Sequence, residues 1–137
     1  MVEGAIVMGV LCILLMGMFE VGLMLMRINS LDEAARRLSR AAVTHGARSS
    51  ANRGVWGPTT MSYKADASHP IAAEVRPYLI GISPSEVEIR LEWPDGHNRA
   101  GGRVRVTLEC VHRQIAWNVL GNGQRTLRRQ STLRISH

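Results

Sequence analysis

The sequence predicts an α+β protein in which a long N-terminal helix, transmembrane in its first half and amphipathic in its second, precedes a small head domain. Three observations lead to this prediction. Residues 5–26 form an apolar run, residues 28–43 repeat apolar side chains at helical spacing, and two later segments alternate apolar and polar residues as half-buried strands do. The chain has 137 residues, which allows one small domain with an attached element and excludes a multidomain enzyme.

Charge is divided unevenly along the chain. All 17 lysines and arginines lie from Arg27 onward, and the only acidic residues before it are Glu3 and Glu20. The net charge of the chain is +6, and the region from Arg27 onward, without these two glutamates, has a formal charge of +8. A basic region of this kind can contact nucleic acid, anionic lipid or an acidic partner.

The apolar run from Ala5 to Met26 is long enough to cross a bilayer. At about 1.5 Å of rise per residue it spans about 33 Å, which matches a hydrocarbon core. A secretory signal peptide is the main alternative, but its basic n-region, short apolar stretch and small-x-small cleavage site are not found here. We therefore predict a transmembrane helix over about residues 5–26.

Two acidic residues and several small ones are candidates for helix packing in the membrane. Glu20 lies inside the apolar run, where a charge at mid-helix costs about 2.5–3.5 kcal/mol. Either it is protonated or reaches toward Arg27 and the near interface, or it meets a polar group on a neighbouring helix, and Glu3 has the same ambiguity. Small residues favour packing because a missing side chain lets two backbones approach closely. These residues are Gly4, Ala5, Gly9, Gly17 and Gly22.

The helical pattern continues past Arg27. Apolar residues recur at intervals of three, four or seven, charged residues occupy the other positions, and Gly46 is a natural stop. An amphipathic extension over residues 27–45 is therefore predicted, in one rod of about 60 Å with the apolar run. Ser30, with a glutamate three residues later, also fits a capping box, so a break just before it is the alternative.

The head is predicted to occupy residues 46–137, with the domain boundary after residue 45. Its first part, residues 46–68, is rich in small and polar residues without a period and is expected to be loop. A short helix is expected from Pro70 to near Gly81, because apolar residues follow one another at four-residue steps, with Pro77 straining it.

Three antiparallel strands are expected in the rest of the head. Apolar and polar residues alternate over residues 86–92 and 103–110, and turn residues, Pro94-Asp95-Gly96 among them, lie between these segments. A third, less regular strand is expected at residues 125–135. Such a sheet needs a cover for its apolar face, and the amphipathic helix of residues 28–45 is the obvious candidate.

No catalytic, cofactor or metal site is predicted, and the chain is not expected to be an enzyme. The five histidines show no ligand spacing, and Cys12 and Cys110 lie in different solvents. No nucleophile elbow, phosphate-binding glycine loop or zinc-protease motif occurs in the sequence.

Arginines of the later strands form a candidate basic face. A solvated strand surface is the simpler interpretation, and contact with nucleic acid, anionic lipid or an acidic partner is the functional one. No aromatic residues alternate with these arginines to stack bases, which argues against nucleic acid. The candidate residues are Arg103, Arg105, Arg125, Arg128 and Arg134.

The chain resembles the TadE-like family of pilus-assembly proteins, the minor pilin-like components of tight-adherence (Flp) type IVb pilus systems in bacteria. The resemblance rests on Val2-Glu3 before the apolar run, on Phe19-Glu20-Val21-Gly22 within it and on the stretch from Asn29 to Arg36 after it. It is strong over residues 2–45 and weaker but consistent beyond, as in Ser131-Thr132-Leu133-Arg134.

The resemblance implies a non-enzymatic minor pilin-like or pseudopilin-like subunit, held as a single-pass protein in the inner membrane. Its partners would be a prepilin peptidase, which clips the precursor just before the apolar helix, other pilin-like subunits and the pilus assembly machinery. Glu3 would correspond to the glutamate that meets a neighbour's N-terminal amine during assembly. Family members carry a short basic leader ahead of this glutamate. Three alternatives account for its absence before Glu3 here: the start is assigned late, the form is already trimmed, or this member is unprocessed.

Two further expectations concern the side of the membrane on which the head lies and a second possible class of function. The resemblance places the head in the periplasm, whereas the arginines after the apolar run would place it in the cytoplasm by the positive-inside rule. We expect the family orientation, because a basic leader would restore the balance. The second hypothesis is a membrane-tethered binding module whose basic sheet recruits an anionic ligand or partner.

Overall fold

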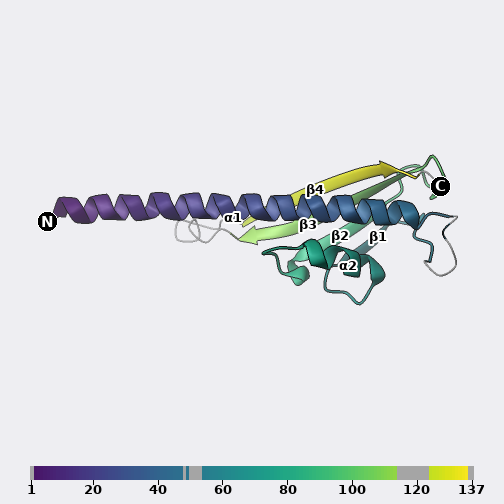
Figure 1. Ribbon diagram of the computed structural model, residues 1–137, viewed down its shortest axis with the longest axis horizontal. Coiled ribbons are helices and arrows are strands. Elements are labelled where there is room, and N and C mark those ends of the chain that lie inside the picture. Colours follow the sequence, from purple (N-terminus) through teal and green to yellow (C-terminus); the bar gives the residue numbers. More distant parts are fainter. Residues whose placement is uncertain (1, 48, 50–53, 114–123, 136–137) are drawn as a thin grey trace.

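The computed structural model describes residues 2–47, 49, 54–113 and 124–135. One helix, α1 (Val2–Thr44), projects from a small head that packs against its C-terminal half (Figure 1). The head contains one further α-helix and an antiparallel sheet. This arrangement confirms the predicted α+β class.

The helix α1 is continuous, so the alternative break before Ser30 is wrong. Its 43 residues extend about 65 Å at about 1.5 Å per residue. Ser30 does not cap a helix. Its hydroxyl accepts a hydrogen bond from the Ile80 N–H at 2.8 Å and donates one to the Tyr78 carbonyl. The local capping signal is overridden because the head provides the partners of this hydroxyl.

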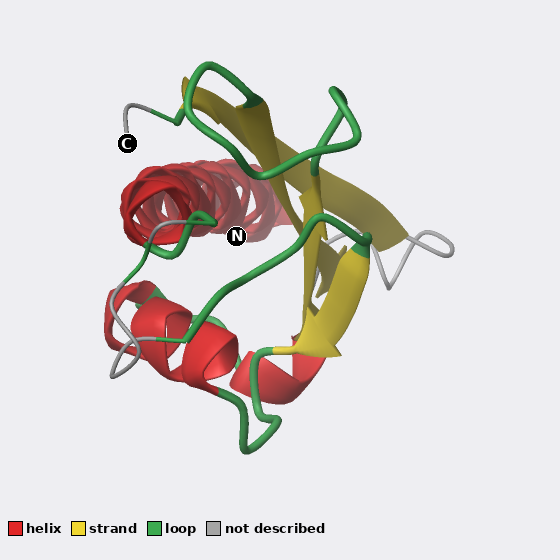
Figure 2. Ribbon diagram, turned by 90° about the vertical axis from the view of Figure 1, so that its right-hand side faces the viewer, coloured by secondary structure: helices red, strands yellow, loops and turns green. Residues whose placement is uncertain are grey.

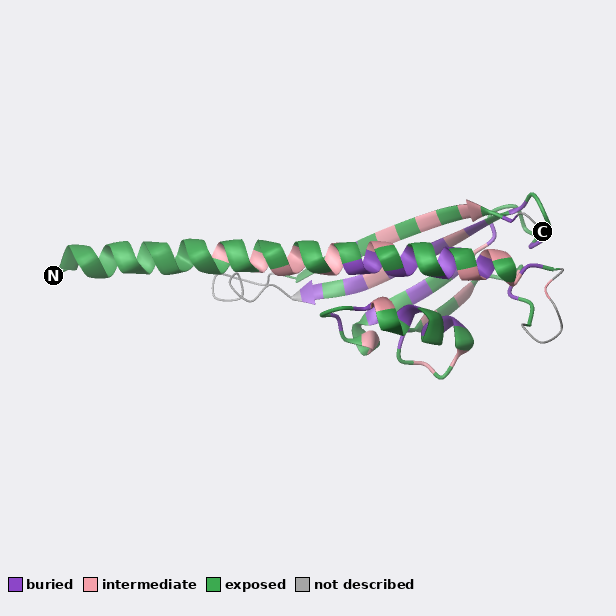
Figure 3. Ribbon diagram, viewed as in Figure 1, coloured by how far each residue is buried: buried purple, intermediate pink, exposed green. Residues whose placement is uncertain are grey.

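The second half of α1 presents a stripe of buried residues to the head. These residues recur at three- and four-residue steps, as expected for one helical face. Fully buried positions are confined to this half of the helix; residues 2–16 are exposed, and half-buried positions lie between the two parts (Figure 3). The amphipathic extension is thereby confirmed. The buried residues are Ser30, Leu31, Ala34, Ala35, Leu38, Ser39 and Ala42.

The sheet has four antiparallel strands in the order β1-β2-β3-β4, and the expectation of three strands is wrong. Three strands match the predicted segments: β2 (Val87–Glu92), β3 (Arg103–Arg113) and β4 (Gln124–Arg134). The additional strand, β1 (Met61–Lys64), lies in the stretch expected to be loop, part of which is outside the described residues. Its four residues pair with β2 at the sheet edge and are too few to show a period.

A short helix and two 3-10 turns connect β1 to β2. They are α2 (Pro70–Val75), η1 (Arg76–Tyr78) and η2 (Pro84–Glu86). Pro70 opens α2 as expected, and the His69 ring nitrogen Nδ1 accepts from the Ile71 N–H at 3.2 Å. The α-helical form ends at Val75 because Pro77 has no N–H to continue the ladder.

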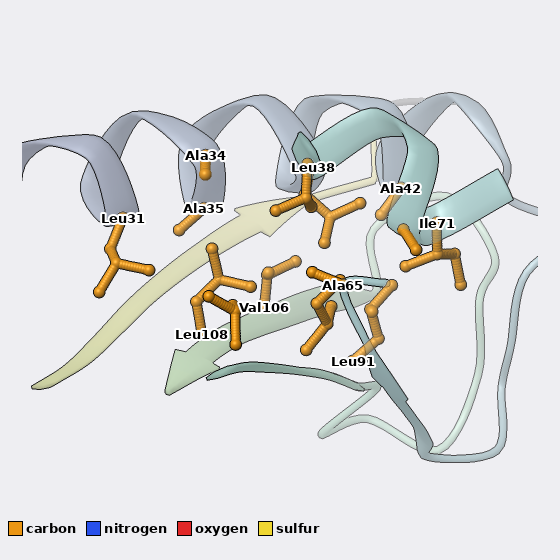
Figure 4. Close-up of a cluster of buried hydrophobic side chains, with 14 of the residues drawn as sticks. Leu31, Ala34, Ala35, Leu38, Ala42, Ala65, Ile71, Leu91, Val106 and Leu108 are labelled. Carbon is orange, nitrogen blue, oxygen red and sulfur yellow. The ribbon is translucent and has the colours of Figure 1, made fainter. Parts of the chain in front are cut away.

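The core lies between the sheet and the two helices, which cover the same face (Figure 2). Leu31 and Leu38 of α1 point toward Val106 and Leu108 of β3 (Figure 4). A polar contact adds to this packing, since the Ser39 and Ser131 hydroxyls lie 3.0 Å apart. Residues of the long helix are therefore part of the head core, and α1 is the cover that the sheet required.

Candidate functional site: the apolar half of the long helix and its junction with the head

The first half of α1 leaves its apolar side chains uncovered. Its most apolar 18-residue window has a mean hydropathy of 2.4, and no part of that window is buried. Phe19 is 69 % exposed and Ile13 is 74 % exposed. Among the described residues, α1 is the one helix long and apolar enough to cross a membrane. A contiguous apolar surface of this size indicates contact with lipid or with other helices.

The glycines of this half are open on all sides. A side chain built at any of them would meet no described atom within 4 Å, so the head does not require glycine there. Glycine in a helix interior costs about 1 kcal/mol relative to alanine. A close approach by another helix would offset this cost. The glycines are Gly4, Gly9, Gly17 and Gly22, and a shallow hollow is formed by Ile13, Leu14, Gly17, Met18 and Val21.

The two acidic residues of the apolar half lie in different surroundings. Glu3 is exposed in the first turn of α1, where the helix dipole favours a negative charge. Glu20 is half-buried and stands seven residues before Arg27, so both lie on the face that Leu31 presents to the head. Glu3 thus lies at the exposed first turn of α1, and Glu20 lies on the side of the helix that faces the head.

A polar cluster forms where α1 meets the end of β3. The Arg27 nitrogen Nη1 lies 2.9 Å from Nδ1 of His112, whose side chain is buried. Burial and the positive charge of Arg27 lower the pKa of His112, while the Glu20 carboxylate opposes that shift. The ring is therefore neutral at pH 7, and Nδ1 can accept the hydrogen bond that Arg27 donates.

Sequence reasoning named Glu20 but missed the role of His112. The spacing of Glu20, Arg27 and Leu31 along one helix face is visible in the sequence. It could have shown that the head-facing stripe begins before Arg27. The partner on β3 could not be found in this way, because it lies 85 positions from Arg27 in the chain.

The outer face of the sheet holds four of the five candidate arginines, and acidic neighbours pair with three of them. The distances are 2.8 Å from Arg103 Nη2 to Asp95 Oδ1, 3.6 Å from Arg105 Nη1 to Glu92 Oε2, and 3.2 Å from Arg128 Nε to Glu109 Oε1. These ion pairs favour the interpretation of a solvated strand surface.

The remaining two candidate arginines have other surroundings. Arg134 donates from Nε to the Gly101 carbonyl at 3.0 Å. Arg125 pairs in register with His112, so it belongs to the core-facing side of β4 and not to the outer face. The five arginines therefore do not form one surface.

The Asp95–Arg103 pair leads to a pH prediction. The bond from the Arg103 guanidinium, with one from the Arg103 N–H, lowers the pKa of Asp95 from 3.8 to about 2. Arg103→Gln is expected to return the midpoint toward 3.8, measured by NMR titration of the carboxyl carbon. Because the folded-state pKa is depressed, the contribution of this pair to stability is complete above pH 3.8 and is lost as the pH falls through about 2.

Arg128→Gln is the matched control for this prediction, because it removes a surface arginine from the same face without touching Asp95. An Asp95 midpoint near 3.8 in the unchanged chain would contradict the assignment of the pair.

Cysteine and metal-ligating residues add no further site in the described part of the chain. Cys12 is exposed on α1 and Cys110 is buried in β3, and both are free thiols. Burial raises the pKa of the Cys110 thiol, so it stays protonated. No group of three or more His, Cys, Asp and Glu side chains is placed to hold a metal ion among the described residues.

The fold and the uncovered half of α1 indicate the general class of this protein. A small α+β head is held on an apolar helix that projects from it, which is consistent with a single-pass membrane protein. Residues 1–51 match the family model described as TadE-like protein, so this part of the chain is similar to that family. The match confirms the resemblance and is consistent with a pilus-associated protein. Comparisons with curated proteins and with solved structures found no match.

Proposed function

We propose that this chain is a minor pilin-like subunit that supports assembly of a Tad (Flp)-type pilus in the bacterial inner membrane. It acts by packing its apolar helix against those of other pilin-like subunits, with the head in the periplasm. The observation that supports this most directly is the uncovered apolar half of α1 in a chain whose first 51 residues match the TadE-like model.

Helix packing in lipid depends on close contact and on polar partners, because lipid tails are as apolar as the side chains themselves. The hollow around Gly17 offers close contact to a neighbouring helix. Glu3 places a carboxylate at the exposed start of α1, where a neighbour's N-terminal amine can pair with it. Both features leave the head free to keep its own fold.

A membrane-tethered binding module is supported less well. Its basic sheet would need arginines free to meet an anionic ligand, but acidic residues pair with Arg103, Arg105 and Arg128. The sheet is therefore better suited to stay solvated than to recruit a ligand by charge.

The proposed role of Glu3 is tested by Glu3→Ala and Glu3→Gln in cells that lack the unchanged gene. Removing the charge is expected to lower the number of surface pili about tenfold, corresponding to about 1.4 kcal/mol of lost pairing. Surface pili are counted by electron microscopy, and co-purification of other pilin-like subunits is measured in parallel.

Glu33→Ala is the matched control, because Glu33 lies on the same helix and pairs with Arg37 of its own chain at 2.7 Å. It is expected to leave piliation unchanged. Normal piliation and normal co-purification in both Glu3 variants would remove the assigned role.

A further inference from the structure

The head packs along α1 toward its N-terminus and overlaps the last part of the apolar run of residues 5–26. Half-buried positions occur at Glu20, Leu23, Met24 and Arg27, before the fully buried stripe begins at Ser30. Steps of three and four residues place them on the head-facing side of the helix. The head is therefore flanked by a part of α1 that its composition alone would assign to the hydrocarbon.

Polar groups gather at this level of the helix. Arg27 and His112 are in contact at 2.9 Å, and Glu20 is close enough to act on the His112 ring electrostatically. The turn after η1 reaches the same level, since a Cβ built on Gly81 would lie 2.5 Å from Cε of Met26. Charged groups are costly in hydrocarbon and stable among headgroups.

The residues between Glu3 and Glu20 come close to spanning the membrane. From Gly4 to Phe19 the helix rises about 24 Å at about 1.5 Å per residue. This is shorter than the hydrocarbon thickness of about 30 Å, and a bilayer accommodates such a mismatch by local thinning at a modest cost. A boundary at Glu20 keeps both acidic residues and the polar cluster out of the hydrocarbon.

Exposed apolar side chains occur on different sides of this end of the head. Ile80 is 64 % exposed and is bonded through its N–H to Ser30 of α1. Val111 is 42 % exposed and precedes His112 in β3, so it lies on the outer face of the sheet, whereas the exposed Arg125 pairs in register with His112 on the core-facing side. Apolar and basic side chains at one end of the head suit the headgroup layer, where each finds its preferred solvent.

The acidic residue Glu86 is also exposed at this end, so the surface is mixed in charge. The other exposed large apolar residue of the described head, Val55, lies at the far end, next to the Trp56 ring that stacks on His45. Val55 therefore offers a matched control for Ile80 and Val111, which lie at the end of the head nearer Glu20.

We propose that the hydrocarbon boundary lies at Glu20, so that Glu20, Arg27 and His112 lie outside the hydrocarbon, and that the end of the head that carries Ile80, Val111 and Arg125 faces the lipid headgroups. This inference rests on the proposed insertion of α1 into the membrane. It shortens the predicted span of residues 5–26 at its C-terminal end and gives the head a lipid-contact surface.

The experiment uses the full chain in vesicles of phosphatidylethanolamine and phosphatidylglycerol at low protein-to-lipid ratio. Single cysteines are introduced at Ile80, Val111 and Val55 in a Cys12→Ser background, and each is labelled with bimane. Cys110 is buried and is expected to stay unlabelled, which the background variant verifies. Quenching by lipids that carry a spin label at the headgroup is expected to be several-fold stronger at positions 80 and 111 than at 55.

Met24→Cys and Ile13→Cys, read with a spin label deep in the acyl chain, locate the boundary. The deep label is expected to quench position 13 strongly and position 24 no more than position 55 at the far end of the head. Deep quenching at position 24 clearly above that at position 55 would place residue 24 in the hydrocarbon and overturn the boundary at Glu20. If the headgroup spin label quenches position 80 no more than position 55, the proposed lipid-contact surface is overturned.

The same series separates failure of this inference from failure of the proposed function. Strong deep quenching at position 13 with either contrary result leaves membrane insertion intact and removes only the inference. No deep quenching at position 13 removes both. Shielding of position 80 from aqueous quencher without quenching by lipid would assign the surface to a neighbouring head and would also overturn the lipid proposal.

Discussion

A fragment that begins at Arg27 is expected to fold in aqueous buffer, whereas one that begins at residue 46 is expected to stay unfolded. The two fragments share the whole of residues 46–137 and differ only in the second half of α1. That half contributes Leu31 and Leu38, both fully buried, to the core. Burying a leucine stabilises by about 1.5–3 kcal/mol, and a small domain has only about 5–15 kcal/mol in total.

The longer fragment should show cooperative thermal unfolding by circular dichroism, with the fluorescence of buried Trp56 and Trp93 changing in the same transition. The shorter fragment should show neither, because a sheet with an uncovered apolar face is not stable alone. Cooperative unfolding of the shorter fragment would show instead that the head begins at residue 46. We therefore propose that the structural boundary of the head falls within α1.

The elements that the sequence predicted well are those in which a regular apolar–polar pattern repeats over many residues. The core-facing residues Val87, Ile89 and Leu91 alternate with charged ones, so β2 could be placed to within one residue of its observed bounds. The strand β1 could not be, because only Met61 and Tyr63 face the core and its register is set by β2. Local signals fail where a distant part of the chain satisfies a group, as the head does for the Ser30 hydroxyl.

The same limit applies to the candidate site. Composition was enough to predict the apolar half of α1, since the structure leaves that half uncovered. The surroundings of Glu20 were not predictable, because His112 comes to it from another element. Strand parity places Arg125 and Arg128 on opposite faces of β4, a distinction that needs the register as well as the composition.

Leu38→Ala is expected to destabilise the head by about 2–5 kcal/mol, because it leaves a cavity between α1 and the sheet. Leu14→Ala removes the same atoms from the same helix, but Leu14 is 60 % exposed. It is expected to change the stability of the head by less than about 0.5 kcal/mol. Chemical denaturation in detergent micelles, followed by tryptophan fluorescence, measures both.

The two leucines should separate folding from assembly. Leu14 lines the hollow around Gly17, so Leu14→Ala is expected to reduce co-purification of other pilin-like subunits while the head keeps its stability. Leu38→Ala would affect assembly only through the loss of folded protein, so its effect should follow the fraction unfolded. Equal losses of head stability in the two variants would mean that the apolar half of α1 is itself part of the head, and helix packing in lipid would then no longer account for its exposed surface.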